Sequence, residues 1–486
     1  MNPPALKRQI GLYTATSIVI GGVIGSGIFM RPSEMAGFLG SPMLLLLVWL
    51  IAGVFTLFSA MVSAEVGAMF PETGGQYVYM RHMYGDFWSY LFGWANFAVI
   101  NTAGTAGVAF IATQYLEYFV KLPRFSPAVE HSVVMHVPLI GDLLPLENIG
   151  VKASTILLLC ILTFISYRST KAGGSLQVFF TTVKVAAIVL LIGGLFFSGK
   201  GSFQNFLVSD YTLKPVGFLA MTAAIVAACN GALQAYDGWY MALNVSGEIK
   251  DPQKNIPRSL FVGLFVCMMV YMLVTAAIIY MMPIGAMAKS ELVASDAARM
   301  AFGTIGGGII AALISINVMG TTNCNVLTPP RITFAMAQEK RFFAWTGKIH
   351  PRFNTPGNAM LLHLFWMIPL VLSGSFFILA DMYIFVVFIF NLMLVAGIYI
   401  LRKKMPDAHR PYRVWGYPWM PALVIIFNLV YLVITVRTDI LNYISGKTHV
   451  INSVFGIILC VIGIPFYFYF KKKYGSNTEG LISGSQ

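Results

Sequence analysis

The stretch that decides the fold is Val19-Ile20-Gly21-Gly22-Val23-Ile24-Gly25-Ser26-Gly27-Ile28-Phe29. It lies in the middle of the first long apolar segment, where a helix in lipid must keep every backbone hydrogen bond. Glycine weakens a helix and frees the chain to leave helical dihedral angles, so Gly25-Ser26-Gly27 predicts a break at mid-membrane depth. Such a break must be buried in protein or line a water-filled cavity. Its free N–H groups attract an anion such as a carboxylate. The alternative is close helix packing, because Gly21/Gly25 and Gly22/Ser26 are small pairs four residues apart.

The composition is that of a protein embedded in a bilayer. Of 486 residues, 57% are hydrophobic and only 10% are charged, and the mean hydropathy is +0.75, outside the range of soluble globular chains. The sequence contains no H-E-x-x-H, P-loop or G-x-S-x-G motif. The five cysteines lie in apolar segments and form no C-x-x-C pair. We expect a conduit and not an enzyme, without cofactor, metal site or disulfide.

Apolar windows long enough to cross a bilayer, about 20 residues each, recur along the chain. They predict an all-α polytopic membrane protein with twelve transmembrane helices and both termini on one side. The polar stretch 475–486 is expected to be a disordered tail. The windows are 10–33, 40–68, 87–120, 149–168, 172–198, 216–246, 256–283, 301–337, 358–375, 377–401, 417–437 and 449–470.

Lysine and arginine are concentrated on one side of these predicted spans. If the N-terminus is cytoplasmic, 21 of the 32 fall inside and 10, Arg31 among them, fall outside. This asymmetry follows the positive-inside rule and predicts cytoplasmic N- and C-termini. It also accounts for the net charge of +13 without a nucleic-acid partner.

A second break is predicted in the sixth span, where Asp237 stands beside Gly238. A carboxylate at this depth is costly unless it faces protein or water. Its alternative role, capping the free N–H groups of a broken helix, also requires the break. Spans 1 and 6 are five spans apart. Because this number is odd, a second unit that begins at span 6 has the opposite orientation in the membrane from the unit that begins at span 1. Paired breaks at the start of two such units are the pattern of an inverted-repeat transporter.

Lys184 lies near the centre of the fifth span, too deep to reach either interface comfortably. Its ammonium needs acceptors, and the broken first span offers carbonyls without helical partners. A fixed positive charge there could replace a bound sodium ion or exchange a proton. The alternative is a lysine that is merely tolerated in a wet cavity.

These features resemble the amino acid–polyamine–organocation superfamily and, within it, the L-type amino acid transporter branch. The resemblance covers residues 8–437, and Gly25-Ser26-Gly27-Ile28-Phe29 is similar to the branch's first-span signature. Further fragments follow in the family's order: FPETGGQY at 70–77, AYDGW at 235–239, EIKDP at 248–252, NIPR at 255–258, HPRFNTP at 350–356 and RPYRVWGYP at 410–418.

The resemblance implies a five-plus-five inverted repeat, 1–200 and 201–405, with two extra helices in 406–474. It implies that the substrate carboxylate binds the N–H groups around Gly25 to Gly27 and that the ammonium binds carbonyls near Ile24 and from Gln234 to Tyr236. Lys184 is similar to the branch's lysine at a vacant sodium position. The implied substrate site comprises Val23, Ile24, Gly25, Ser26, Gly27, Gln234, Ala235, Tyr236, Asp237, Gly238, Trp239 and Asn391.

Three of these side chains keep a structural alternative. Tyr236 and Trp239 would act as gating aromatics or pack the interior. Asn391 would contact substrate or help gate, or else form a hydrogen bond between helices.

Two departures from the branch affect the expected function. Many members have glycine where Asp237 stands, which bears on the charge of the accepted side chain. Animal members have a cysteine that links a glycoprotein subunit after span 3, whereas 121–148 contain none, so no disulfide-linked partner is expected.

The function expected is sodium-independent secondary transport of neutral L-amino acids, by exchange or proton coupling, in the plasma membrane of a prokaryote. The alternatives are a carrier of cationic amino acids or polyamines, suggested by Asp237, and an amino-acid receptor that does not transport.

Overall fold

The computed structural model describes residues 8, 10–25, 27–72, 74–168, 170–210, 212–213, 215, 217–327, 329–353 and 355–474, and between 170 and 182 only the side chain of Phe180. Ser26, predicted to bind substrate, and the tail 475–486, predicted to be disordered, lie outside the described residues.

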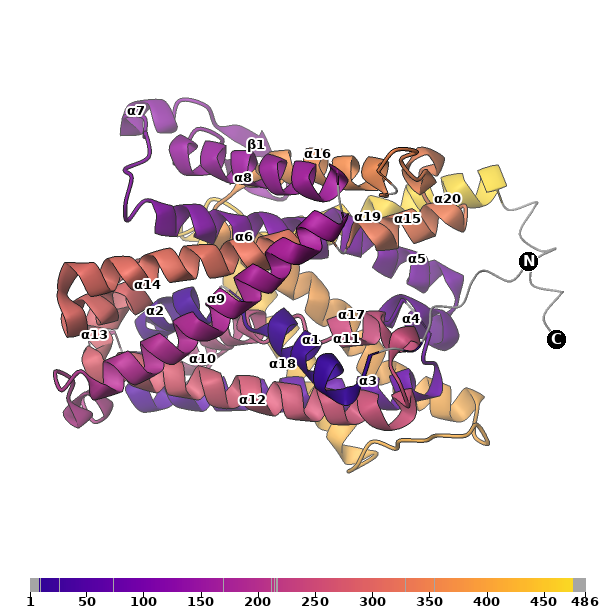
Figure 1. The fold of residues 1–486 in the computed structure, drawn as a ribbon, viewed down its shortest axis with the longest axis horizontal. Helices are drawn as coiled ribbons and strands as arrows, with labels where there is room; N and C mark the ends of the chain where they lie inside the picture. The colour runs from indigo at the N-terminus through magenta and orange to yellow at the C-terminus, as the bar shows by residue number, and fades with distance from the viewer. Residues whose placement is uncertain are drawn as a thin grey trace.

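The described chain is almost entirely helical (Figure 1). One short antiparallel hairpin, β1 Met135–Val137 with β2 Gly141–Leu143, lies in the loop after α6. The α-helices are α1 Leu12–Val23, α2 Gly27–Leu39, α3 Pro42–Met69, α4 Gln76–Tyr84, α5 Asp86–Ala95, α6 Asn101–Leu116, α7 Pro127–Glu130, α8 Ile149–Arg168, α9 Thr170–Phe197, α10 Phe218–Ala235, α11 Met241–Asn244, α12 Pro252–Met281, α13 Ile284–Ala288, α14 Val293–Leu327, α15 Pro330–Gln338, α16 Gly357–Ser373, α17 Phe376–Lys404, α18 Trp419–Ile444, α19 Asn452–Val461 and α20 Gly463–Tyr474. The π-helix η1 Asn96–Ile100 joins α5 to α6, and the 3-10 helices are η2 Phe203–Phe206, η3 Ser246–Glu248 and η4 Ala344–Gly347.

The all-α membrane fold is confirmed. Within the described residues, 9 helices are long and apolar enough to cross a bilayer, and the bent pair α1 and α2 raises the number to 10. Two shorter apolar helices, Val183–Phe197 within α9 and α16, fall in the remaining predicted windows. The total of twelve spans stays a prediction.

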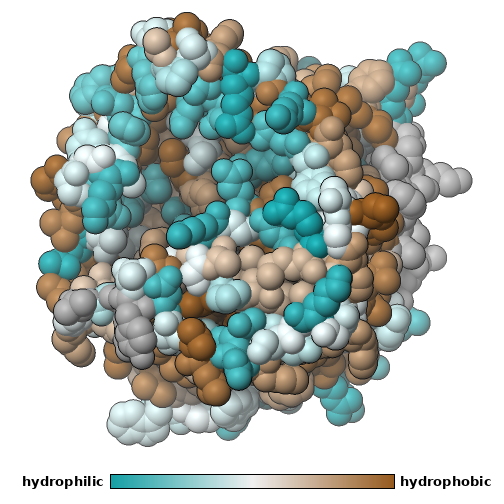
Figure 2. All heavy atoms as spheres, turned by 90° about the vertical axis from the view of Figure 1, so that its left-hand side faces the viewer, coloured by the Kyte–Doolittle hydropathy of each residue, from teal (hydrophilic) through white to brown (hydrophobic). Residues whose placement is uncertain are grey.

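The connecting segments gather at the two ends of the bundle (Figure 1). The segments predicted outside, α7 and α13, lie at its left end, and α4, predicted inside, lies toward its right end, as do α15 and α20 at the ends of predicted spans 8 and 12. Figure 2 shows the left end face on, with hydrophilic side chains gathered over its middle. The connecting segments therefore alternate between the two ends of the bundle in the predicted order.

Both predicted breaks are present. Helix α1 ends at Val23, and α2 begins at Gly27 with its axis bent by 44°. Helix α10 ends at Ala235, and the chain turns through 236–240 before α11. Within this turn Gly238 has φ +100°, a left-handed conformation that side chains other than glycine rarely adopt.

Candidate functional site

The two breaks lie against one another. A Cβ built on Gly22 would lie 2.7 Å from the Gly238 carbonyl oxygen, and one on Gly27 would lie 2.7 Å from the Ala235 Cα. Real Cβ atoms do not come this close to backbone, so glycine at these two positions is what lets the broken helices meet.

Tyr271, from the middle of α12, joins the two breaks. Its hydroxyl lies 2.8 Å from the Val23 carbonyl oxygen at the end of α1 and 2.8 Å from the Ala235 carbonyl oxygen at the end of α10. These carbonyls belong to last turns that have no helical donor. The Tyr271 ring packs on Trp49 and Tyr236, with centroids 5.3 and 4.9 Å away, which fixes the hydroxyl in place.

A cavity of about 60 Å³ lies at this junction. Seven of the predicted residues line it: Val23, Gly25, Gly27, Gln234, Ala235, Asp237 and Gly238. The rest of the wall comes from other elements: Gly22 of α1, Ile100 of η1, Asn101, Gly104 and Val108 of α6, Tyr240 and Met241 after the second break, Thr321 and Asn325 of α14, and Tyr383 of α17.

The helix ends give this cavity two electrical poles. The N-terminus of α2 presents the first-turn N–H groups from Gly27 onward, a partial positive charge. The C-termini of α1 and α10 present carbonyls, a partial negative charge. A guest with a carboxylate and an ammonium a few bonds apart satisfies both poles at once.

Asp237 adds a carboxylate to the wall. Its Oδ2 accepts from the Tyr240 hydroxyl at 3.3 Å, and no lysine or arginine is among the described residues that line this cavity. The carboxylate therefore favours a guest that carries a positive group.

Lys184, on α9, does not line the cavity but holds the end of α1. Its side chain is 5% exposed, and its Nζ donates to the Gly21 carbonyl oxygen at 3.2 Å. That carbonyl lies in the last turn of α1, where a cation is favoured by the helix dipole.

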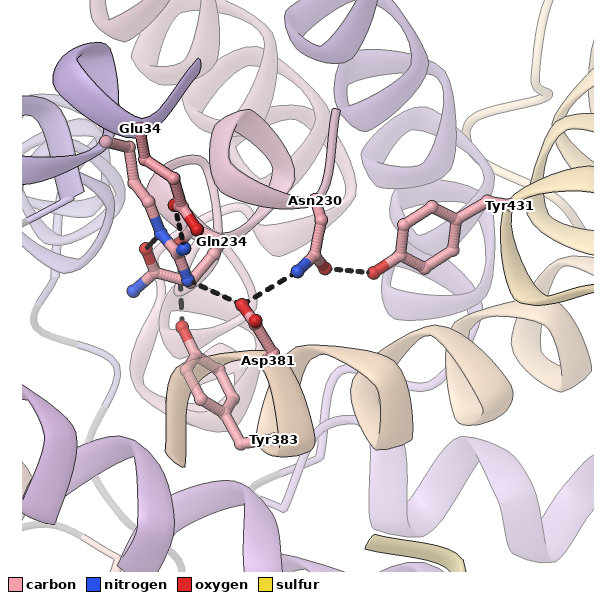
Figure 3. A network of polar contacts seen from close by, with 7 residues as sticks. Glu34, Asn230, Gln234, Asp381, Tyr383 and Tyr431 are labelled. Atoms are coloured by element: carbon pink, nitrogen blue, oxygen red, sulfur yellow. Dashed lines mark hydrogen bonds and ion pairs between the residues drawn. The ribbon is translucent and has the colours of Figure 1, made fainter. Parts of the chain in front are cut away.

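Figure 3 shows a polar network that includes Gln234 and Tyr383, two residues that also line the cavity. Arg31 is fully buried and pairs with Glu34 and, at 2.9 Å, with Asp381 of α17. Its Nε donates to Gln234 Oε1 at 3.1 Å. Arg31 is counted above among the outside charges; it lies within α2, where two carboxylates compensate its charge, and its side of the membrane stays a prediction.

The network continues to α18. Asn230 of α10 donates to Asp381 Oδ1 at 2.8 Å and accepts from the Tyr431 hydroxyl. Glu34, on the far side, lines an open depression of about 870 Å³. The network therefore stands between the cavity and this end of the bundle.

At the opposite end, the FPETGGQY fragment packs against the segment after the second break. Gly74 N–H donates to the Asn244 carbonyl oxygen at 3.2 Å. The Tyr77 hydroxyl donates to Glu339 at 2.9 Å, and Arg81 pairs with the same carboxylate at 2.8 Å. Burial raises the pKa of Tyr77, and Glu339 raises it further.

The remaining predicted residues lie close by without lining this cavity. Ile24 is buried at the break. Tyr236 and Trp239 are buried, and Tyr236 packs with Trp49 as its structural alternative requires. Asn391 donates to Ser59 Oγ at 3.2 Å. This is a hydrogen bond between two helices, the structural role considered for Asn391 as an alternative to substrate contact.

Sequence reasoning missed Tyr271, Asn101, Asn325 and Tyr383. Asn101 directly follows the π-helix, a distortion often found at functional sites, but no sequence pattern announces it. For α14, the two polar residues Thr321 and Asn325 within an apolar span could have indicated that this helix faces a site.

Comparison with known proteins agrees with this geometry. Residues 10–466 match the family model described as amino acid permease. The serine/threonine exchanger SteT of Bacillus subtilis (strain 168) is 31% identical over 97% of this chain and 98% of its own. Large neutral amino acids transporter small subunit 2 of Mus musculus is 29% identical over 96% of this chain and 81% of its own. Asc-type amino acid transporter 1 of Homo sapiens is 27% identical over 96% and 82%.

The match spans both breaks, the cavity and the Arg31 network, and it confirms the resemblance drawn from the sequence fragments. The chain belongs to the amino acid permease family, in the amino acid–polyamine–organocation superfamily.

Proposed function

We propose that this membrane protein is a sodium-independent secondary transporter of neutral L-amino acids, working by alternating access as an exchanger or with proton coupling. The observation that carries the proposal is the meeting of two broken helices at a cavity with opposite electrical poles. The names of its relatives, a serine/threonine exchanger and a large neutral amino acids transporter, point to the same class of cargo.

The size of the cavity favours a small amino acid. Since one water needs roughly 10–15 Å³ of such space, about 60 Å³ accommodates roughly four to six non-hydrogen atoms. The carboxylate would bind at Gly25, Ser26 and Gly27, and the ammonium at the carbonyls of Ile24 and the α10 end, beside Asp237. Alanine, with six non-hydrogen atoms, matches this space.

Alternating access requires the two ends of the cavity to open in turn. At the α2 end, the Arg31 network must separate, because it joins α2 and α10 to α17 and α18. Counterpart helices of the two predicted repeats, 1–200 and 201–405, pack in pairs: α2 on α10, α3 on α12 and α6 on α14. This pairing supports the five-plus-five arrangement, with 406–474 outside it.

Lys184 would replace the sodium ion of sodium-dependent transporters. Its ammonium already holds the Gly21 carbonyl, so a metal cation is not needed to stabilise the end of α1. An ammonium can also lose its proton, which gives the proton-coupled form of the proposal a candidate group.

A carrier of cationic amino acids or polyamines is the second candidate. The Asp237 carboxylate favours it, since no basic residue is among the described lining residues. A neutral zwitterion also provides one ammonium, and the space beyond Asp237 is small, so we place neutral cargo first.

Topology and partners complete the proposal. The N- and C-termini would be cytoplasmic, in the plasma membrane of a prokaryote. The loop 121–148 has no cysteine, so no subunit would be attached there by a disulfide.

Counterflow in proteoliposomes tests the function. Vesicles loaded with unlabelled alanine or serine should take up labelled alanine equally well with sodium or choline outside. Strict sodium dependence would refute the role of Lys184, and competition by arginine or putrescine but not leucine would favour the cationic carrier. Substrate binding without any counterflow would identify a receptor.

A further inference from the structure

A second, smaller cavity of about 20 Å³ lies behind the first. Asp237 and Tyr240 line both, so this pair forms their common wall. The other polar residues that line it include Thr56 and Ser59 of α3, Gln76 of α4, Asn391 of α17 and Asn428 of α18. This places α18, a helix outside the two predicted repeats, next to the predicted substrate site.

Asn428 is the unusual residue of this cavity. Its side chain is 0% exposed, yet neither Nδ2 nor Oδ1 has a hydrogen-bond partner among the described residues. Asn391 Oδ1 is also without a partner, although its Nδ2 donates to Ser59. Buried amide atoms are costly to leave unpaired, so the cavity is built for a guest that forms hydrogen bonds.

The chemistry of the guest follows from these atoms. Together the two amides offer an N–H donor and carbonyl acceptors. A hydroxyl or carboxamide can both donate and accept, whereas an ammonium only donates and a carboxylate only accepts. An apolar group would leave all of these atoms unpaired. Space of about 20 Å³ holds roughly one or two non-hydrogen atoms, the end of a short side chain.

We propose that this cavity is the side-chain subsite of the transported amino acid and that Asn428 selects a hydroxyl side chain, as in serine or threonine. The inference rests on the proposed function, which positions the amino acid's carboxylate and ammonium at the helix ends. From there its side chain would pass the Asp237–Tyr240 wall toward Asn428.

Threonine and valine provide the test, because they have the same shape and differ by a hydroxyl in place of a methyl. Their ability to compete with labelled serine is measured in counterflow for the native chain and for Asn428→Leu. The native chain should prefer threonine by about tenfold, the effect of roughly one hydrogen bond, and Asn428→Leu should abolish this preference while valine still competes.

Asn317→Leu is the matched control. Asn317 of α14 is also 0% exposed, with both amide atoms unpaired among the described residues, and it lines neither cavity. It should leave the threonine-to-valine ratio unchanged.

The possible outcomes distinguish the subsite from the proposed function. Equal competition by valine and threonine in the native chain overturns the subsite even if Asn428→Leu does not fold, and so does an unchanged ratio in Asn428→Leu. In both cases the cavity holds only water. Absence of counterflow with every amino acid would instead refute the proposed function.

Discussion

Removal of the Tyr271 hydroxyl tests how the two broken helices are held together. In Tyr271→Phe the ring keeps its contacts with Trp49 and Tyr236, but the carbonyls of Val23 and Ala235 lose the hydroxyl between them, whose one proton is shared by the two acceptors at 2.8 Å. Leaving a buried acceptor unpaired costs about 1–3 kcal/mol. If substrate binds only the joined arrangement, its affinity falls by about 5- to 150-fold. Isothermal titration of alanine or serine into purified protein measures this loss.

Tyr84→Phe is the control for the loss of a tyrosine hydroxyl. The Tyr84 hydroxyl donates to the Met393 carbonyl oxygen at 2.6 Å, away from the cavity. This variant should lose stability without losing affinity. Native affinity in Tyr271→Phe, with the protein folded, would show that the hydroxyl does not hold the junction.

Three further changes test the other contacts. Gly22→Val should abolish counterflow, because its Cβ would lie 2.7 Å from the Gly238 carbonyl oxygen; substantial activity would contradict the close approach. Lys184→Ala should lower turnover at least about tenfold, since one charge-assisted hydrogen bond to Gly21 is worth roughly 1.5–3 kcal/mol, and near-normal turnover would refute its role. Arg31→Gln leaves Glu34 and Asp381 without a counter-ion, a loss of up to about 3–5 kcal/mol for a fully buried pair; the thermal midpoint in detergent should fall and partly recover when Asp381→Asn is added, and no recovery would argue against the pairing.

The breaks could be predicted from sequence because glycines and an aspartate contradict a continuous lipid-facing helix. Their contact could not be, since Gly22 and Gly238 are brought together by the packing of distant spans. Tyr271 carries no signal, because a tyrosine in an apolar span is equally suited to packing.

The pairing of Arg31 could not be predicted for a related reason. Charge counting along the chain cannot show that Arg31 is buried in α2, or that Asp381, far along the chain, supplies its counter-charge. Asn428 has no distinct signal in the sequence, because one asparagine in an apolar span is equally typical of a helix-to-helix hydrogen bond, and only the structure shows its amide unpaired among the described residues.

The most direct measurement of the central claim compares alanine with analogues that lack one of its charges. Alanine methyl ester has no carboxylate, and lactate has no ammonium. If the α2 N-terminus and the α1 and α10 C-termini each hold one charged group, only intact alanine should compete for labelled alanine in counterflow. Equal competition by either analogue would show that the corresponding pole does not bind the substrate.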